Sequence, residues 1–82
     1  MATVEVRLFA SLRELAGATP CVRVEGGTVG ALVDELSARY GERFGQIARA
    51  GTVVVDGERV AYDHPLAGGE EVAVLPPFSG GA

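Results

Sequence analysis

The sequence predicts an α+β domain in which one long amphipathic helix packs on one face of a small mixed sheet. Short segments at residues 3–9 and 71–75 alternate apolar and polar side chains, as half-buried strands do. Between them, apolar residues recur with helical spacing and form a stripe made of Val29, Leu32, Val33, Leu36 and Tyr40. The 82 residues suffice for one domain, which we place at residues 1–77, followed by a flexible tail at 78–82.

The first strand is followed by the signals of a short helix. Alternation places Val4, Val6 and Leu8 on one side of the strand, and Glu5, Arg7 and Phe9 on the other. Ser11 and Glu14 then have the Ser-x-x-Glu spacing of a capping box, in which both side chains accept backbone N–H groups at a helix start. We expect this helix to end by Gly17 and Pro20, before a second strand at residues 21–25.

The long helix has its own start and stop signals. Gly26-Gly27 predicts a turn, Thr28 is the expected N-cap, and Gly41 is the expected C-terminal stop. Residues 42–51 give a weaker pattern, and we expect only that Phe44 and Ile47 pack under the edge of the sheet.

The second half of the chain predicts a hairpin and a final strand. Residues 52–56, of which the first four are β-branched, predict a third strand. Asp56-Gly57 at its end is a strong hairpin turn signal that leads to a short strand near residues 59–61. A further connection precedes the last strand at 71–75, which we expect Val72 and Val74 to anchor in the centre of the sheet.

Composition argues against several classes of function. The net charge is −4 and the seven basic residues are scattered, so the clustered positive charge of nucleic-acid binders is missing. No apolar run approaches the length of a membrane span, and the N-terminus lacks the pattern of a signal peptide. Cys21 is the single cysteine, which leaves no internal disulfide. We expect a cytoplasmic protein with neither nucleic acid nor membrane as a partner.

The residues that could carry catalysis are few. His64 is the only histidine, so we expect no metal site. Cys21 falls in a predicted strand, where a lone cysteine usually acts as a small apolar residue. Glu70 and Glu71 are adjacent in the chain and point to opposite sides if extended, which favours solvated carboxylates. There is no phosphate-binding glycine motif, and we expect no bound cofactor. The sequence therefore predicts a protein that other proteins act upon.

The C-terminal segment is the most unusual part of the sequence. Pro76-Pro77 cannot extend a strand ladder and favours a stiff polyproline II exit. Phe78 places an apolar side chain on the arm that follows, and Gly80-Gly81 supplies backbone without Cβ atoms, which can thread a narrow channel. These features suit a partner that must reach a terminal carboxylate.

Three segments resemble the ubiquitin-like sulfur carriers of the MoaD/ThiS family, and within it the small subunits of molybdopterin synthase. They are LFASLRELAG at 8–17, VDGERVAYDHPL at 55–66 and GGEEVAVLPPFSGG at 68–81. The resemblance covers essentially the whole chain, and its last segment is highly specific. It implies a β-grasp fold, in agreement with the order of elements expected from the residues alone.

The resemblance also implies a mechanism and two partners. An adenylating enzyme of the ubiquitin-activating type would use Mg-ATP to convert the Gly81 carboxylate into an acyl-adenylate. Sulfur would then displace AMP to leave a thiocarboxylate, and the tail would enter the active site of the large subunit of molybdopterin synthase. ATP is thus consumed by the partner, and the catalytic side chains belong to partners.

The same resemblance implies a docking surface on the sheet face away from the helix. Its partner-binding residues would be Phe9, Leu75, Pro76, Pro77, Phe78, Gly80 and Gly81. Arg59 departs from the family pattern, which is often apolar there, and we expect it to weaken the patch or change the preferred partner.

Ala82 is the main departure from the family, whose active carriers end on the second glycine. One extra residue shifts the carboxylate by up to ~3.6 Å. We expect a peptidase to remove Ala82 and expose Gly81.

Two alternative functions stay open: a carrier for another pathway (cysteine, thiamine, tRNA or a secondary metabolite), or a β-grasp interaction module or protein modifier that transfers no sulfur. A chain without lysine could be a conjugation donor but could not form lysine-linked chains of itself.

Overall fold

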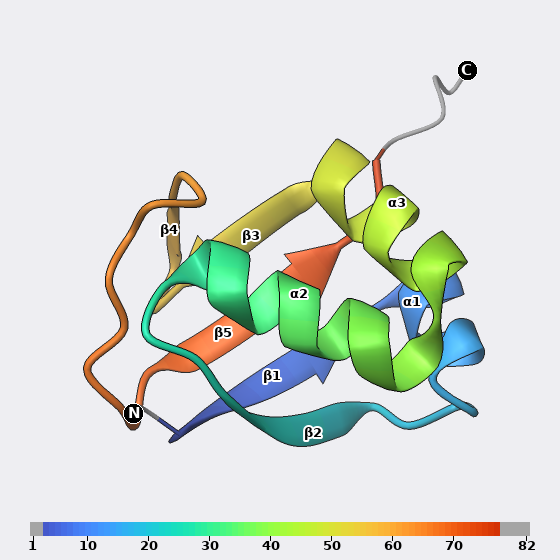
Figure 1. Cartoon of the computed structure of the whole chain (residues 1–82), viewed down its shortest axis with the longest axis horizontal. Coiled ribbons are helices and arrows are strands. Elements are labelled where there is room, and N and C mark those ends of the chain that lie inside the picture. Colours follow the sequence, from blue (N-terminus) through green and yellow to red (C-terminus); the bar gives the residue numbers. More distant parts are fainter. Residues whose placement is uncertain (1–2, 78–82) are drawn as a thin grey trace.

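A five-stranded mixed sheet forms one layer of the molecule, and helices pack against one of its faces (Figure 1). The computed structural model describes residues 3–77. Its elements in chain order are β1 (Thr3–Leu8), α1 (Ala10–Leu15), β2 (Cys21–Glu25), α2 (Val29–Tyr40), α3 (Glu42–Ala50), β3 (Thr52–Val55), β4 (Glu58–Arg59) and β5 (Glu71–Leu75). This is the predicted α+β arrangement, and its order matches the expected β-grasp fold with one helix added.

The first and last strands lie side by side in the middle of the sheet. The strand order is β2-β1-β5-β3-β4, with β1 and β5 parallel and the other pairs antiparallel. β5 is therefore paired on both sides up to Val74, and with β3 through Leu75, as expected for a central strand. The chain therefore leaves the sheet from a central strand that is paired on both sides, which fixes the position of the segment that follows.

The core lies between the sheet and α2. The predicted helical stripe is confirmed: its first four members are fully buried, and Tyr40 is partly buried against the core. The sheet supplies Val4, Val6 and Leu8 from β1 and Val72 and Val74 from β5, all 2% exposed or less. Complete burial of one such side chain contributes about 1.5–3 kcal/mol, so these residues hold the two layers together.

Most of the predicted helix and turn signals are confirmed. The Thr28 hydroxyl accepts a hydrogen bond from the Ala31 N–H at 3.2 Å, and α2 ends at Gly41. Asp56 and Gly57 both have positive φ, at 50° and 88°, as a type I′ hairpin turn requires. The strand that follows is shorter than expected, because β4 stops at Arg59 and pairing ends after the Val60 N–H bonds the Val53 carbonyl.

The predicted capping box at the start of α1 is wrong. The N-cap is Phe9, whose backbone carbonyl accepts the N–H groups of Leu12 and Arg13, and no side chain caps the helix. A positive φ of 52° at Ala10 turns the chain sharply out of β1 and starts the helix one residue before Ser11. Ser11 and Glu14 therefore lie inside the helix, where they cannot act as a capping pair.

The helix α3 was not predicted as a helix. Phe44 is buried and Ile47 partly buried, but both pack from α3, which lies beside α2 (Figure 1). The Phe44 ring lies 5.4 Å from the ring of Tyr40. The other buried positions of α3 are Gly45 and Ala48, which are too small to produce an apolar stripe in the sequence.

Candidate partner-binding surface at the tail exit

The sheet face opposite α2 and α3, which we call the open face, is divided into a charged half and an apolar half. Register places Glu5 opposite Arg23, and Thr3 opposite Glu25, across β1 and β2. The residues of β5 and β3 that point to the open face near the tail exit are less polar, namely Ala73, Leu75, Thr52 and Val54. The side chains of Arg7 and Glu71 form an ion pair of 3.2 Å where the two halves meet.

A hollow of about 510 Å³ lies at the end of the apolar half, and we call it the exit hollow. Four residues predicted to bind partners come together there, namely Phe9, Leu75, Pro76 and Pro77. Phe9 is 41% exposed, and Leu75 and Pro76 are partly buried. The remaining lining residues are Ala10, Thr52, Val54 and Arg59.

Backbone pairing explains why the exit hollow forms at this place. Leu8 pairs with Val74 in the parallel ladder, so Phe9 comes level with Leu75. Thr52 pairs with Leu75 on the other side of β5. Pro76 has no N–H group and ends the ladder, and the chain leaves the sheet between these neighbours. The exit hollow is therefore a direct consequence of a central β5 followed by two prolines.

Arg59 lines the exit hollow from β4, the outermost strand. Its partner in the β3–β4 hairpin is Val54, which places both residues on the open face. Alternation of β3 alone would have found Thr52 and Val54, whereas the contribution of Ala10 depends on the sharp turn after β1. A guanidinium beside an apolar hollow suits a partner that offers a carboxylate or carbonyl next to apolar groups.

The remaining predicted site residues cannot be placed. Phe78, Gly80 and Gly81, together with Ala82, lie outside the described residues. The structure therefore defines where the tail starts, at Pro76-Pro77, and the residues around that point.

The family model that matches the chain is that of the ThiS family, over residues 6–81. The match includes every residue of the exit hollow, from Phe9 to Pro77, and runs to the second glycine of the Gly-Gly pair. The chain belongs to the ThiS family. It is thus a ubiquitin-like protein of the sulfur-carrier type, as its sequence indicated.

Two characterised relatives of this ThiS-family chain match it over nearly its whole length. The molybdopterin synthase sulfur carrier subunit of Escherichia coli is 36% identical over 95% of this chain and 99% of its own. Small archaeal modifier protein 1 of Haloferax volcanii is 38% identical over 95% and 100%. The solution structure of small archaeal modifier protein 1 from Methanosarcina acetivorans superposes with a TM-score of 0.85, at 28% identity over 98% and 97% of the two chains. These likenesses confirm the β-grasp fold.

Two of the polar residues considered for catalysis in this ThiS-family protein, Cys21 and Glu70, have clear local surroundings in the structure. Burial, and next the nearby Glu5 carboxylate, raise the pKa of the Cys21 thiol, which disfavours the nucleophilic thiolate. The Glu70 carboxylate accepts the N–H groups of Ala67 and Gly68 at 2.7 Å each, and these bonds lower its pKa. Glu70 thus orders the loop before β5. Within residues 3–77, no three His, Cys, Asp or Glu side chains converge on a point where a metal could bind.

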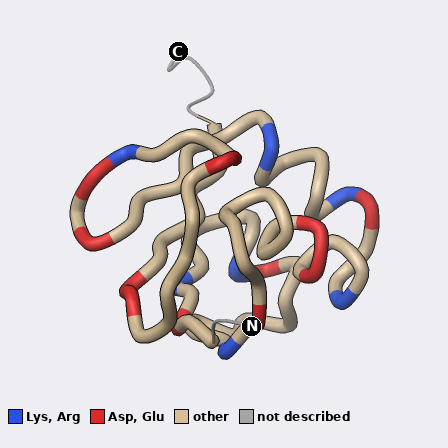
Figure 2. The backbone as a smooth tube through the Cα atoms, turned by 60° about the vertical axis from the view of Figure 1, so that its left-hand side comes forward, with Lys and Arg blue, Asp and Glu red and all other residues tan. Residues whose placement is uncertain are grey.

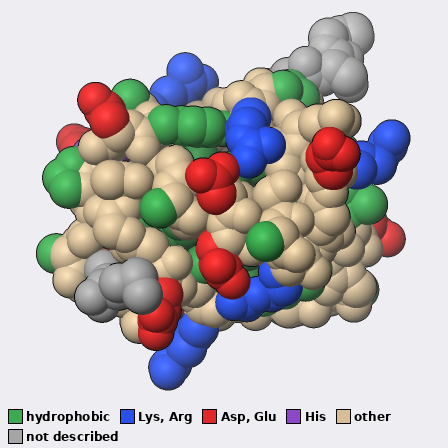
Figure 3. All heavy atoms as spheres, viewed as in Figure 1, with side chains coloured by type: hydrophobic (Ala, Val, Ile, Leu, Met, Phe, Trp, Pro, Cys, Tyr) green, Lys and Arg blue, Asp and Glu red, His purple; other side chains and the backbone are tan. Residues whose placement is uncertain are grey.

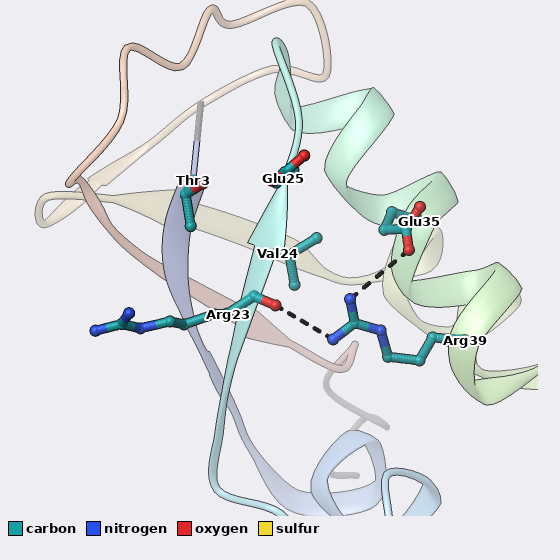
Figure 4. Close-up of a pocket in the computed structure, with 6 residues that line it drawn as sticks. All are labelled: Thr3, Arg23, Val24, Glu25, Glu35 and Arg39. Carbon is teal, nitrogen blue, oxygen red and sulfur yellow. Dashed lines mark hydrogen bonds and ion pairs between the residues drawn. The ribbon is translucent and has the colours of Figure 1, made fainter. Parts of the chain in front are cut away.

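A second groove lies between the outer edge of β2 and α2 (Figure 4). Arg39 reaches from α2 to the Arg23 backbone carbonyl at 3.2 Å, and its guanidinium lies 3.7 Å from the Glu35 carboxylate. One outward carbonyl of this edge strand is thus already occupied, which is a known means of preventing edge-to-edge pairing. We therefore expect this contact to have a protective role, in that it hinders pairing of another strand with β2.

Charges elsewhere on the described surface are mixed in sign. Acidic and basic positions follow one another along the backbone (Figure 2), and the helix face shows both signs among apolar side chains (Figure 3). Asp34 and Arg49, for example, form an ion pair of 2.8 Å between α2 and α3. In the part of the chain that the structure describes, no helix is long and apolar enough to cross a membrane.

Proposed function

We propose that this chain is the sulfur-carrying small subunit of a molybdopterin synthase, with Gly81 as the residue that carries the sulfur after removal of Ala82. The observation that carries the proposal is the near full-length identity of 36% with the Escherichia coli sulfur carrier subunit. The family match up to residue 81 supports Gly81 as the reacting position.

The chemistry begins with activation of the Gly81 carboxylate. A carboxylate is a poor electrophile until one oxygen becomes part of a good leaving group. An adenylating enzyme of the ubiquitin-activating type attaches AMP from Mg-ATP to this oxygen and releases pyrophosphate. A sulfur nucleophile then attacks the carbonyl carbon and expels AMP, which leaves a thiocarboxylate. The large subunit binds the tail and directs the sulfur onto the pyranopterin precursor.

The described residues have the role of docking and projection in this proposal. The exit hollow offers apolar surface from Phe9, Leu75 and Pro76 beside the Arg59 guanidinium. A partner that covers the exit hollow binds the chain directly before the first residues of the tail. Pro77 then leads away from the sheet, and polyproline stiffness reduces the conformational freedom lost when the tail enters a channel.

A second candidate function is that of a protein modifier. The 38% identity with small archaeal modifier protein 1 favours it. The absence of lysine from all 82 residues is compatible with a conjugation donor, but it prevents lysine-linked chains of this protein with itself. The activated Gly81 carbonyl would then be attacked by an amine of another protein and form an amide. Carriers for other pathways, including cysteine, thiamine, tRNA and secondary-metabolite thiolation, share the activation step and differ only in the acceptor.

Intact mass spectrometry separates these candidates. Chains ending at Ala82 and at Gly81 are each incubated with the adenylating enzyme, Mg-ATP and a sulfur source. The proposal expects exchange of one oxygen for sulfur on the chain ending at Gly81, and on the longer chain only when a peptidase has removed Ala82. Transfer of that sulfur to the pterin precursor in the presence of the large subunit supports the synthase. Amide adducts to other proteins without sulfur support the modifier, and a chain that reacts in neither form contradicts both.

A further inference from the structure

The backbone at Gly51 lies against the point where the chain leaves the sheet. Gly51 is the residue between α3 and β3, and it directly precedes Thr52, which pairs with Leu75 at the end of the β3–β5 ladder. Continuing that antiparallel register by one step places Gly51 opposite Pro76. The last turn of α3 and the start of the tail are therefore neighbours across the end of the sheet.

The approach at this point is too close for any side chain on residue 51. A Cβ atom built there would overlap the Leu75 carbonyl oxygen and lie 3.0 Å from both the Leu75 and Pro76 carbonyl carbons. These are backbone atoms and cannot swing aside as a flexible side chain can. A β-carbon on residue 51 would therefore displace the backbone at Leu75 and Pro76.

The displaced residues are the ones that line the exit hollow and begin the tail. Leu75, Pro76 and Pro77 all contribute to the hollow, and Pro76 fixes the direction of the first step out of the sheet. Because the φ of proline is fixed, a change in direction at Leu75 and Pro76 also redirects Pro77, the last described residue before the tail. The close contact at residue 51 is thus a constraint on the tail exit, and it does not come from a left-handed backbone, since the φ of Gly51 is −94°.

We propose that Gly51 is a positioning residue for tail delivery: by letting the α3–β3 junction contact the Leu75–Pro76 backbone, it sets the direction in which the tail leaves the domain. This proposal rests on the proposed function in one respect only, namely that a partner must receive the tail. The contact between Gly51 and the exit is independent of which partner that is.

Two other glycines provide matched controls for Gly51→Ala. A Cβ at Gly26 would lie 3.0 Å from the Leu32 backbone nitrogen, so Gly26→Ala strains the backbone at α2, in a part of the fold that does not line the exit hollow. A Cβ at Gly27 would meet nothing within 4 Å, so Gly27→Ala tests the substitution alone. The comparison of Gly51→Ala with Gly26→Ala separates an effect on the tail from a general loss of stability.

The first measurement is made on the full chain and needs no partner. In the unaltered protein, NMR should show nuclear Overhauser contacts between the Gly51 Hα protons and Pro76; their absence would overturn the proposal even if Gly51→Ala fails to fold. In Gly51→Ala, amide shift changes should centre on residues 74–75 and 51–53. In Gly26→Ala they should centre on the start of α2. Equal changes at the exit in both variants would also overturn it.

The second measurement is pyrophosphate release by the adenylating enzyme, with the three variants in the form of the chain that the enzyme accepts. It is made at a temperature at which all of them are folded. Gly51→Ala should lose roughly ten- to a hundredfold in kcat/KM, because misplacing a reacting group by ~1 Å can cost about 10²-fold. Gly26→Ala and Gly27→Ala should stay close to the unaltered chain. Equal rates for Gly51→Ala and Gly26→Ala contradict the proposal. If the unaltered chain is never activated, the proposed function is contradicted instead, and the NMR measurement alone decides on the role of Gly51.

Discussion

Replacing Phe9 with alanine tests whether the exit hollow binds the partner. Phe9 is 41% exposed, and a phenylalanine side chain has about 200 Å² to bury, so docking can cover about 80 Å² more. At about 25 cal/mol per Å² this area corresponds to about 2 kcal/mol, or roughly a thirtyfold weaker Kd for Phe9→Ala. Isothermal titration calorimetry of the variant against the large subunit of the synthase measures this change directly.

Tyr62 supplies the matched control for this measurement. It is the other large apolar side chain exposed on the described residues, at 36%, and its hydroxyl donates a hydrogen bond to the Ala48 carbonyl of α3. Tyr62 does not line the exit hollow, so Tyr62→Ala should leave the Kd unchanged while the protein stays folded. The reasoning is refuted if Phe9→Ala binds as tightly as the unaltered chain, or if Tyr62→Ala weakens binding equally.

Three further predictions concern the stability and solubility of the domain. Thr28→Ala should lower the free energy of unfolding by about 1 kcal/mol because the Ala31 N–H loses its acceptor, whereas Ser11→Ala should change it by less than about 0.5 kcal/mol; urea unfolding of both variants checks the pair. The pKa of Glu70 lies below its ordinary value of 4.5, so its carboxylate stabilises the folded chain above pH 4.5, and this contribution is lost as the pH falls through the lowered pKa. Below pH 4.5, the free energy of unfolding of Glu70→Gln should therefore depend less on pH than that of the unaltered chain. Equal pH dependence in the two proteins would contradict the role of Glu70. Arg39→Ala should free the Arg23 carbonyl at the edge of β2 and increase self-association in light scattering, and a variant that stays monomeric at high concentration would disprove the protective role.

The parts of the fold that could be predicted are those in which burial shows directly in the spacing of large apolar residues. The α2 stripe and the alternation of β1 and β5 are of this kind, because each inward position carries a valine or leucine. The helix α3 could not be found this way, since two of its three buried positions are Gly45 and Ala48. The start of α1 was missed because a positive φ at Ala10 moved the helix ahead of its apparent cap.

The candidate site shows the same division between local and long-range information. Phe9, Leu75 and the proline pair could be found because strand alternation and proline chemistry are local. Alternation of β3 also indicates Thr52 and Val54, but the register that brings them beside β5 is set by the packing of distant segments. Ala10 joins the hollow through a sharp turn that no local pattern indicated. Gly51 lies 24 positions before Leu75 in the chain, and only the folded structure brings their backbones together.

The central claim is that Gly81 carries sulfur in the cell. Tandem mass spectrometry of the protein isolated from the cells that make it, without reconstitution, tests this claim most directly. The account predicts a population that ends at Gly81 and has one oxygen of its terminal carboxylate replaced by sulfur. A protein that always continues to Ala82, with no sulfur at its end during active cofactor synthesis, would contradict it.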